Sequence, residues 1–402
     1  MNRPAAFAMI LPACLLTLGS LSACSALDAN GESTEPRPVH SSAETLDPDE
    51  INGSGTAGAG ERSTGVVDPG WDAAAQEAEG VFLSLHEAET DLEFRAVDSD
   101  GTILWSAQRP RVCSGFLVTA SADGPVAVLM DQQSGPRGSL ATTASGFDLH
   151  TGEKLWGPVE VPGPLLGSGL VFAGPPKDFI GPGGPRTALD PANGGVLAVE
   201  DGDSPRILAL LERHLVLADG EELIGEDLEG RRLWTRPVAD LGLTAAEARE
   251  TPWQTIGGSH ALIGSGGGQR TLIDLRSGDT VARDIDGAGF DSHSRTLVTS
   301  DSKLHGFDLD GTKRWDAPLD GGDGLSAVGA GLVVTESSTR DADDDGTQTR
   351  SADDGKLIDS DEELPEHEDF GAPHHIADSG ARLVGDPGSP LLVPPVNRTA
   401  KK

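Results

Sequence analysis

The stretch GFDLDGTKRW, residues 306–315, decides the fold of this chain because near copies of it recur. Residues 225–234 read GEDLEGRRLW, and residues 96–105 read AVDSDGTILW. Looser copies surround Asp148, Asp190 and Asp274, and a worn copy ends at Gly355. Self-similarity at a regular period is the sequence signature of a repeat architecture, so the chain is predicted to be a repeat protein.

Each copy is predicted to form a tight turn between two antiparallel strands. An Asp lies three or four residues before a Gly, where its carboxylate can accept hydrogen bonds from backbone N–H groups of the turn. The Gly supplies the positive φ that closes the turn, and apolar residues alternate with polar ones on both sides. The turn glycines are Gly101, Gly152, Gly194, Gly230, Gly278, Gly311 and Gly355, spaced roughly 33 to 51 residues apart.

This spacing predicts an all-β fold, a β-propeller with seven blades of four antiparallel strands each. In the second blade, for example, strands are expected at 116–119, 126–130, 144–149 and 154–156. Residues 376–377, 382–385 and 391–393 are further candidate strands, which either complete the first blade or build a degenerate eighth one.

The connections divide between the two faces of the propeller. If the strands of a blade are lettered a to d in chain order, the Asp/Gly turns all join c to d. The long insertions at 131–141, 174–185 and 338–346 join b to c, and the one at 238–251 joins d to the next a. The b–c and d–a connections share one face, which we call the loop face. We expect any binding surface there, because loops on a rigid scaffold commonly carry function.

The N-terminus has the form of a lipoprotein signal peptide, assigned to residues 1–23. A short basic start precedes an apolar run from Ala5 to Leu21, and the sequence LSAC ends at Cys24. This pattern predicts acylation of Cys24, export, and a lipid anchor on the outer face of the cytoplasmic membrane, or in an outer membrane if the source has one. An ordinary signal peptide with an incidental Cys is the alternative.

Three further segments follow the signal peptide. Residues 24–70 are rich in Ser, Gly, Pro, Asp and Glu and are predicted to be a disordered tether. A flexible chain of that length has a root-mean-square reach of about 35–40 Å. Residues 71–396 are predicted to form the propeller and residues 397–402 a tail. Since Cys113 has no partner once Cys24 carries lipid, no internal disulfide is expected.

The charge of the chain limits its partners. Acidic residues outnumber basic ones 65 to 30, which gives a formal net charge of −35. Such a charge argues against nucleic acids and anionic lipid surfaces as partners. It suits a soluble monomer, and it also suits a cation or a basic protein as the ligand.

The run FDLHTGEKLW, residues 147–156, resembles the repeat of pyrroloquinoline-quinone (PQQ) type propellers, whose blades end in a pattern like Leu-Asp-x-x-Thr-Gly-x-x-x-Trp. The resemblance extends in weakened copies from about Val81 to Leu364. It implies the fold but no single activity. That superfamily includes quinoprotein dehydrogenases, with PQQ and calcium at the propeller centre, and non-enzymatic lipid-anchored assembly scaffolds. The larger dehydrogenases carry adjacent cysteines beside the quinone, and no Cys-Cys pair exists here.

The Trp residues have different predicted roles. The four at positions 105, 156, 234 and 315 follow a turn Gly by four residues and are expected to wedge between blades. Trp253 follows the d–a insertion on the loop face. It is the Trp predicted to take part in binding, because an exposed aromatic side chain is a common anchor for a partner.

Residues 341–347, DADDDGT, match the opening of a calcium-binding loop. Asp341, Asp343 and Asp345 take positions 1, 3 and 5, Gly346 supplies the sharp turn, and Thr349 falls at position 9. Position 12 is Ala352 instead of a bidentate Glu, so the ligand set is incomplete. A calcium site and a solvated acidic loop are the two interpretations.

These features predict a lipid-anchored, extracytoplasmic β-propeller without catalysis, which binds an envelope or membrane protein as a scaffold. No cofactor is expected, with calcium left open and PQQ disfavoured. Two alternatives stand beside this hypothesis: a PQQ-dependent oxidoreductase, and a calcium-dependent adhesion or sensing module.

Overall fold

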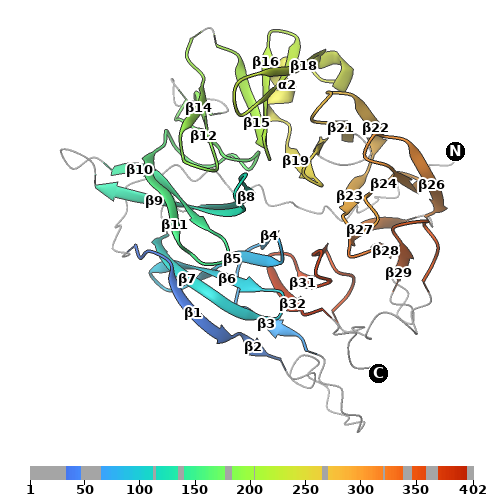
Figure 1. Cartoon of the computed structure of the whole chain (residues 1–402), viewed down its shortest axis with the longest axis horizontal. Coiled ribbons are helices and arrows are strands. Elements are labelled where there is room, and N and C mark those ends of the chain that lie inside the picture. The colour runs from blue at the N-terminus through green and yellow to red at the C-terminus, as the bar shows by residue number, and fades with distance from the viewer. Residues whose placement is uncertain are drawn as a thin grey trace, which may run out of the picture.

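A computed structural model describes residues 33–46, 65–111, 115–134, 140–176, 183–202, 204–264, 270–319, 322–337, 346–358 and 370–395. These residues form eight antiparallel sheets arranged in a ring, and each sheet is one blade of a β-propeller (Figure 1). The predicted all-β propeller is confirmed, and the candidate strands near the C-terminus build an eighth blade. No helix in the described ranges is long and apolar enough to cross a membrane.

Blades 1 to 4 follow one another along the chain as meanders of neighbouring strands. Blade 1 contains β4 (Gln76–Ala78), β5 (Val81–Glu87), β6 (Asp91–Asp98) and β7 (Thr102–Pro110). Blade 2 contains β8 (Phe116–Ala120), β9 (Pro125–Ser134), β10 (Leu140–Asp148) and β11 (Lys154–Glu160). Blade 3 contains β12 (Val171–Ala173), β13 (Arg186–Leu189) and β14 (Val196–Val199), with Leu165 bridged to Phe172 in place of a first strand. Blade 4 contains β15 (Arg206–Leu211), β16 (His214–Asp219), β17 (Glu222–Asp227) and β18 (Arg232–Pro237).

Blades 5 to 8 complete the ring. Blade 5 contains β19 (Trp253–Ile256), β20 (His260–Ile263), β21 (Arg270–Asp274) and β22 (Thr280–Ile285). Blade 6 contains β23 (Gly287–Asp291), β24 (Thr296–Ser300), β25 (Lys303–Phe307) and β26 (Lys313–Pro318). Blade 7 contains β27 (Asp323–Gly329), β28 (Leu332–Ser337) and β29 (Thr347–Ser351), with Leu357 bridged to Arg350. Blade 8 contains β30 (His375–Ile376), β31 (Arg382–Asp386) and β32 (Ser389–Val393), and its fourth strand is β3 (Val67–Asp68) from the N-terminal side of the chain.

The seven Asp/Gly turns all join the third and fourth strands of their blades, as predicted. Asp148 Oδ1 accepts a hydrogen bond from the Thr151 N–H at 2.7 Å, and Asp274 Oδ1 accepts one from the Arg276 N–H at 2.7 Å. The seven turn glycines have φ values between 70° and 85°. Five turns are capped in this way by the predicted Asp. In blade 6 it is Asp310 that accepts the Thr312 N–H, and in blade 7 Ser351 stands where the other turns have Asp.

Residues 33–46, which we call the strap, lie on the outside of the ring. β1 (Arg37–Ser42) pairs with β7 as a fifth strand of blade 1, and β2 (Glu44–Thr45) pairs with β3 in blade 8 (Figure 1). The predicted disordered tether is wrong for residues 33–46 and 65–70. The composition misleads here because every residue of β1 is exposed. Backbone ladder bonds to β7, not apolar burial, hold this strand.

The four repeat Trp side chains pack between consecutive blades, as predicted. A Cβ on Gly278 in the blade 5 turn would lie 2.7 Å from the Trp234 ring of blade 4, so the glycine leaves room for the indole. Each indole N–H also donates a hydrogen bond to a carbonyl in the turn of the next blade: Trp105 to Leu149 at 2.8 Å, Trp156 to Pro191 at 2.8 Å, Trp234 to Leu275 at 2.6 Å and Trp315 to Ala352 at 3.1 Å.

Candidate binding face

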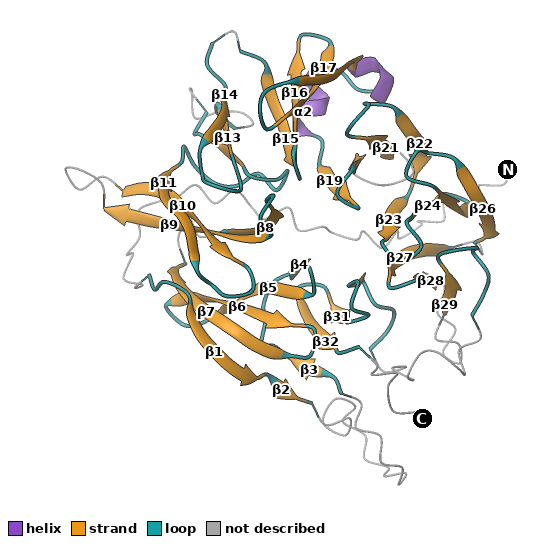
Figure 2. Ribbon diagram, viewed as in Figure 1, coloured by secondary structure: helices purple, strands orange, loops and turns teal. Residues whose placement is uncertain are grey.

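The loop face carries one insertion that the structure describes in full. Residues 238–252, which we call the helical insertion, connect β18 of blade 4 to β19 of blade 5. They contain the two helices of the described chain, η2 (Val238–Leu241) and α2 (Ala245–Glu250), drawn in purple in Figure 2. The tips of the other three predicted insertions, at 135–139, 177–182 and 338–345, lie outside the described residues.

The start of α2 is fixed by the capping box that the sequence predicts. Thr244 Oγ1 accepts the Glu247 N–H at 3.3 Å, and the Glu247 carboxylate accepts the Thr244 N–H at 2.8 Å. The bond from the Thr244 backbone holds the pKa of Glu247 below its ordinary value. A six-residue helix is too short to be stable alone, so its position depends on contacts with the blades.

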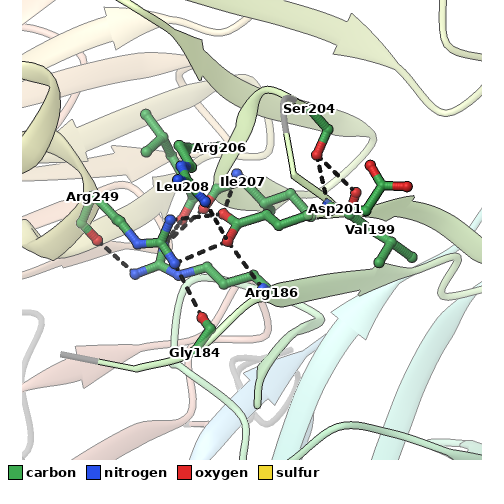
Figure 3. Close-up of polar contacts among 10 residues, drawn as sticks. Gly184, Arg186, Val199, Asp201, Ser204, Arg206, Ile207, Leu208 and Arg249 are labelled. Carbon is green, nitrogen blue, oxygen red and sulfur yellow. Dashed lines mark hydrogen bonds and ion pairs between the residues drawn. The ribbon is translucent and has the colours of Figure 1, made fainter. Parts of the chain in front are cut away.

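A buried carboxylate supplies several of those contacts (Figure 3). Glu200 follows β14 of blade 3, and its side chain is 1 % exposed. Its two carboxylate oxygens accept hydrogen bonds from Arg249 of α2 at 3.0 and 2.9 Å. The same oxygens accept the backbone N–H of Ile207 at 2.8 Å and that of Arg186 at 3.1 Å. One side chain thereby joins blade 3, blade 4 and the helical insertion.

Arg186 of β13 completes this arrangement, which we call the Glu200 cluster. Its guanidinium donates to the Ile207 carbonyl and to the Arg249 carbonyl, each at 2.8 Å. Burial, together with the positive charge of Arg249, lowers the pKa of Arg186 to about 10. Arg186 therefore stays charged at neutral pH. Because both Glu200 oxygens are fully engaged, the cluster positions the insertion and leaves no carboxylate lone pair for acid–base chemistry.

Trp253 is not accessible to a partner. It begins β19, is 2 % exposed, and packs with Val238 and Ala248 in the core beneath the insertion. Its indole N–H donates to the Ala248 carbonyl at 3.1 Å. The prediction of Trp253 as an exposed binding residue is wrong, because the insertion folds back over the indole. Trp253 supports the loop face from below.

The lipidation and calcium residues lie mostly outside the described chain. Cys24, Asp341, Asp343 and Asp345 are not among the described residues. Thr349 lies buried in β29 and pairs with Val334. Within the ranges that the structure describes, no group of three or more His, Cys, Asp or Glu side chains is arranged to hold a metal ion. The calcium site and the lipid anchor stay predictions.

The centre of the ring is lined by the first strands of the blades. Among these first strands in the described chain, β19 contains a Trp, which is Trp253. The core and α2 enclose its ring. The resemblance to PQQ propellers implies a central Trp on which the quinone stacks. The described residues do not fit that requirement, since the available indole presents no free face.

The sequence interpretation missed the Glu200 cluster. Glu200 directly follows the apolar strand VLAV, and an acidic residue at the end of an apolar run is a weak indication of a paired carboxylate. Its partner Arg249 is 49 residues away, in the helical insertion. Only closure of the blades brings the two side chains together.

Comparison with known proteins yields similar folds without a close relative. No protein-family pattern and no curated protein matches the sequence. Among solved structures, BamB from Moraxella catarrhalis is 14% identical over 81% of this chain and 97% of that protein, with a TM-score of 0.44. The computationally designed Ika8 protein is 13% identical over 82% of this chain and 98% of its own length, with a TM-score of 0.45. Quinohemoprotein alcohol dehydrogenase from Comamonas testosteroni is 10% identical over 83% of this chain and 76% of that enzyme, with a TM-score of 0.39. Likenesses at this level carry no argument about function.

Proposed function

We propose that this chain is a lipid-anchored, extracytoplasmic propeller that acts as a non-catalytic protein-binding scaffold at the cell envelope, with its partner site on the loop face. The observation that carries the proposal is the way the helical insertion is held. The Glu200 cluster, the capping box and the Trp253 indole fix a six-residue helix against blades 3, 4 and 5. Such preorganisation lowers the entropy cost of binding a partner.

The strap supports a membrane-proximal location for this face. The Ser33 hydroxyl donates to Asp131 at 2.7 Å, on β9 near the end that leads into the b–c connection. The chain takes nine steps from one residue to the next (33 − 24) between Cys24 and Ser33. Since an extended chain spans at most about 3.3–3.6 Å per residue, an acylated Cys24 lies within roughly 32 Å of Ser33. This distance is shorter than the reach of about 35–40 Å that a flexible tether through residue 70 would have.

The proposal is tested by photo-crosslinking in cells. A photoreactive residue is placed at Ala246, exposed on α2, and in a matched protein at Glu229, exposed in the c–d turn of blade 4. We expect Ala246 to capture a discrete envelope or membrane protein and Glu229 to capture none. A Cys24→Ala change is expected to move the protein out of the membrane fraction and to abolish the crosslink.

Each other result counts against part of the proposal. Capture from Glu229 alone would place the partner on the opposite face. No capture from either position, together with a raised melting temperature on addition of PQQ and calcium, would favour a quinoprotein. A Cys24→Ala protein that stays in the membrane fraction would contradict the lipid anchor.

A further inference from the structure

Strand β14 differs from the other outer strands of the propeller. The outer strand of a blade presents unpaired backbone groups, and proteins commonly protect such an edge with charged residues or proline. β14 reads VLAV and has neither. The other blades each carry at least one charge on the outermost segment that the structure describes: Arg37 on β1, Lys154 on β11, Arg232 on β18, Arg283 on β22, Lys313 on β26, Lys356 beside the Leu357 bridge and Glu44 on β2.

Two apolar side chains of β14 are also largely exposed to solvent. Val196 is 60% exposed and Val199 is 47% exposed. Both residues belong to β14, which is the edge strand of the sheet β12-β13-β14. Within the described ranges, no further strand pairs with it. An exposed apolar strand at a sheet edge is costly unless something covers it.

The backbone of β14 is oriented to accept another strand. The Glu200 N–H donates to the Arg186 carbonyl at 2.9 Å, and Thr187 pairs with Val199. In an antiparallel ladder, this places the Ala198 groups toward β13. The N–H and C=O groups of Val199 then point to the open edge. The register shifts between Ala188 and Leu189, so Leu197 forms a bulge and the regular alternation ends there. Val199 therefore offers the donor and acceptor from which the ladder to an added strand would start.

Blade 1 of the same molecule shows an added strand at the equivalent edge. There β1, with the sequence RPVHSS, lies antiparallel to β7 as a fifth strand (Figure 1). This added strand contains an Arg and no acidic residue. β14 is flanked by Asp190 at one end and Asp201 at the other, so the same non-acidic character suits an added strand there.

We propose that the β14 edge binds an extended segment of another protein by strand addition, and that this segment alternates apolar residues and carries basic rather than acidic ones. A second copy of the chain is a poorer occupant. Two copies would bring together formal charges of −35 each, and a four-residue edge would contribute little area to a stable dimer.

The probe is a fluorescent, acetylated and amidated peptide, Lys-Val-Thr-Val-Thr-Val-Lys, titrated with the whole folded protein by anisotropy. We expect saturable binding that Val196→Lys weakens by at least about tenfold, because a lysine on the edge repels the peptide and blocks pairing. Leu233→Lys on β18 is the matched control. Leu233 is 43% exposed on an edge that already carries charges, so this change is expected to leave the affinity within about twofold.

Two further peptides separate strand addition from simple charge attraction. A version N-methylated at alternate residues keeps the charge but loses the ladder hydrogen bonds, and it should bind at least about tenfold more weakly. A version with Glu in place of Lys should also bind more weakly. The proposal is overturned by absent binding to the unmodified protein, by equal effects of Val196→Lys and Leu233→Lys, or by a dimer in sedimentation that Val196→Lys dissociates. The Ala246 crosslink concerns the loop face, so either result can fail without the other.

Discussion

At the scale of single residues, glycines determine how closely two blades approach. Gly169 forms a parallel bridge with Leu210 of β15, and the Leu210 N–H donates to the Ser168 carbonyl at 2.9 Å. A Cβ on Gly169 would overlap the Leu210 carbonyl, whereas a Cβ on Gly167 would meet nothing within 4 Å. Both glycines have positive φ, at 80° and 77° respectively. They differ in their neighbours and not in their backbone conformation.

This pair yields a stability prediction with its control built in. Gly169→Ala and Gly167→Ala share the cost of a positive φ, which is about 1–2 kcal/mol. Gly169→Ala must in addition push blade 3 away from blade 4, so we expect its free energy of unfolding to be lower by a further 1–3 kcal/mol, roughly the cost of overpacking. Urea denaturation of the two variants measures the difference. Equal losses would show that the two blades separate without cost at this point.

At the scale of secondary-structure elements, the helical insertion depends on a carboxylate outside it. The Glu200 side chain neutralises charge that would otherwise be buried on Arg249 and Arg186. Removing one partner of a buried ion pair is costly because the remaining charge is left uncompensated. Replacing Glu200 should therefore destabilise α2 on the loop face, although Glu200 itself belongs to blade 3.

Glu200→Gln keeps the shape of the side chain and removes its charge. We expect it to lower the free energy of unfolding by about 3 kcal/mol and to speed amide hydrogen exchange in α2. Glu222→Gln on β17, where the carboxylate is exposed, is the control and should change stability by less than about 0.5 kcal/mol. Unchanged exchange in α2 of the Glu200→Gln protein would mean that the capping box and Trp253 alone hold the insertion.

The elements that the sequence predicts are those specified by neighbouring residues. In blade 2, alternating residues and the turn at Gly152 locate all four strands, because turn chemistry and period-2 burial act within a few positions. Trp253 and β1 were interpreted wrongly for the opposite reason. The insertion that covers Trp253 is held by Glu200, about fifty residues away, and β1 is held by its ladder to β7, about sixty-five residues away. Contacts of this range leave no periodic pattern in a single sequence.

At the scale of the whole molecule, the ring is closed by pieces from both ends of the described chain. β3 completes blade 8. The strap, which precedes β3 in the chain, begins beside blade 2, where Glu35 pairs with Lys154, and continues along blade 1 and blade 8. Turn spacing predicted seven blades and left the eighth open, because blade 8 lacks the Asp/Gly turn: its last two strands, β32 and β3, are not consecutive in the sequence. The closing blade also places a partly buried His374 next to β30, which makes the stability of the ring depend on pH.

Burial, with the neighbouring His375 as a second cause, lowers the pKa of His374 to about 4, and the nearby Asp386 only partly offsets this. Burial also lowers the pKa values of His214 and His260. A histidine that is neutral in the folded protein takes up a proton on unfolding once the pH falls below about 6.5. The contribution of His374 to stability is therefore complete above about pH 6.5 and is lost as the pH falls toward 4.

Between pH 7.5 and pH 5, we expect His374 to account for about 1–2 kcal/mol of lost stability, a range that allows for its partial contact with solvent. Over the same pH interval, the free energy of unfolding of a His374→Gln variant should fall by about 1–2 kcal/mol less than that of the unmodified protein. This difference does not depend on how stable the variant is at pH 7.5. His150→Gln, at an exposed position in the blade 2 turn, is the control and should follow the unmodified protein. Carboxyl groups such as Asp310, whose pKa is lowered by the Thr312 N–H, change charge below this range and do not obscure the comparison. Urea denaturation at several pH values gives the curves, and parallel curves for His374→Gln and the unmodified protein would show that the closing blade opens to solvent before the ring unfolds.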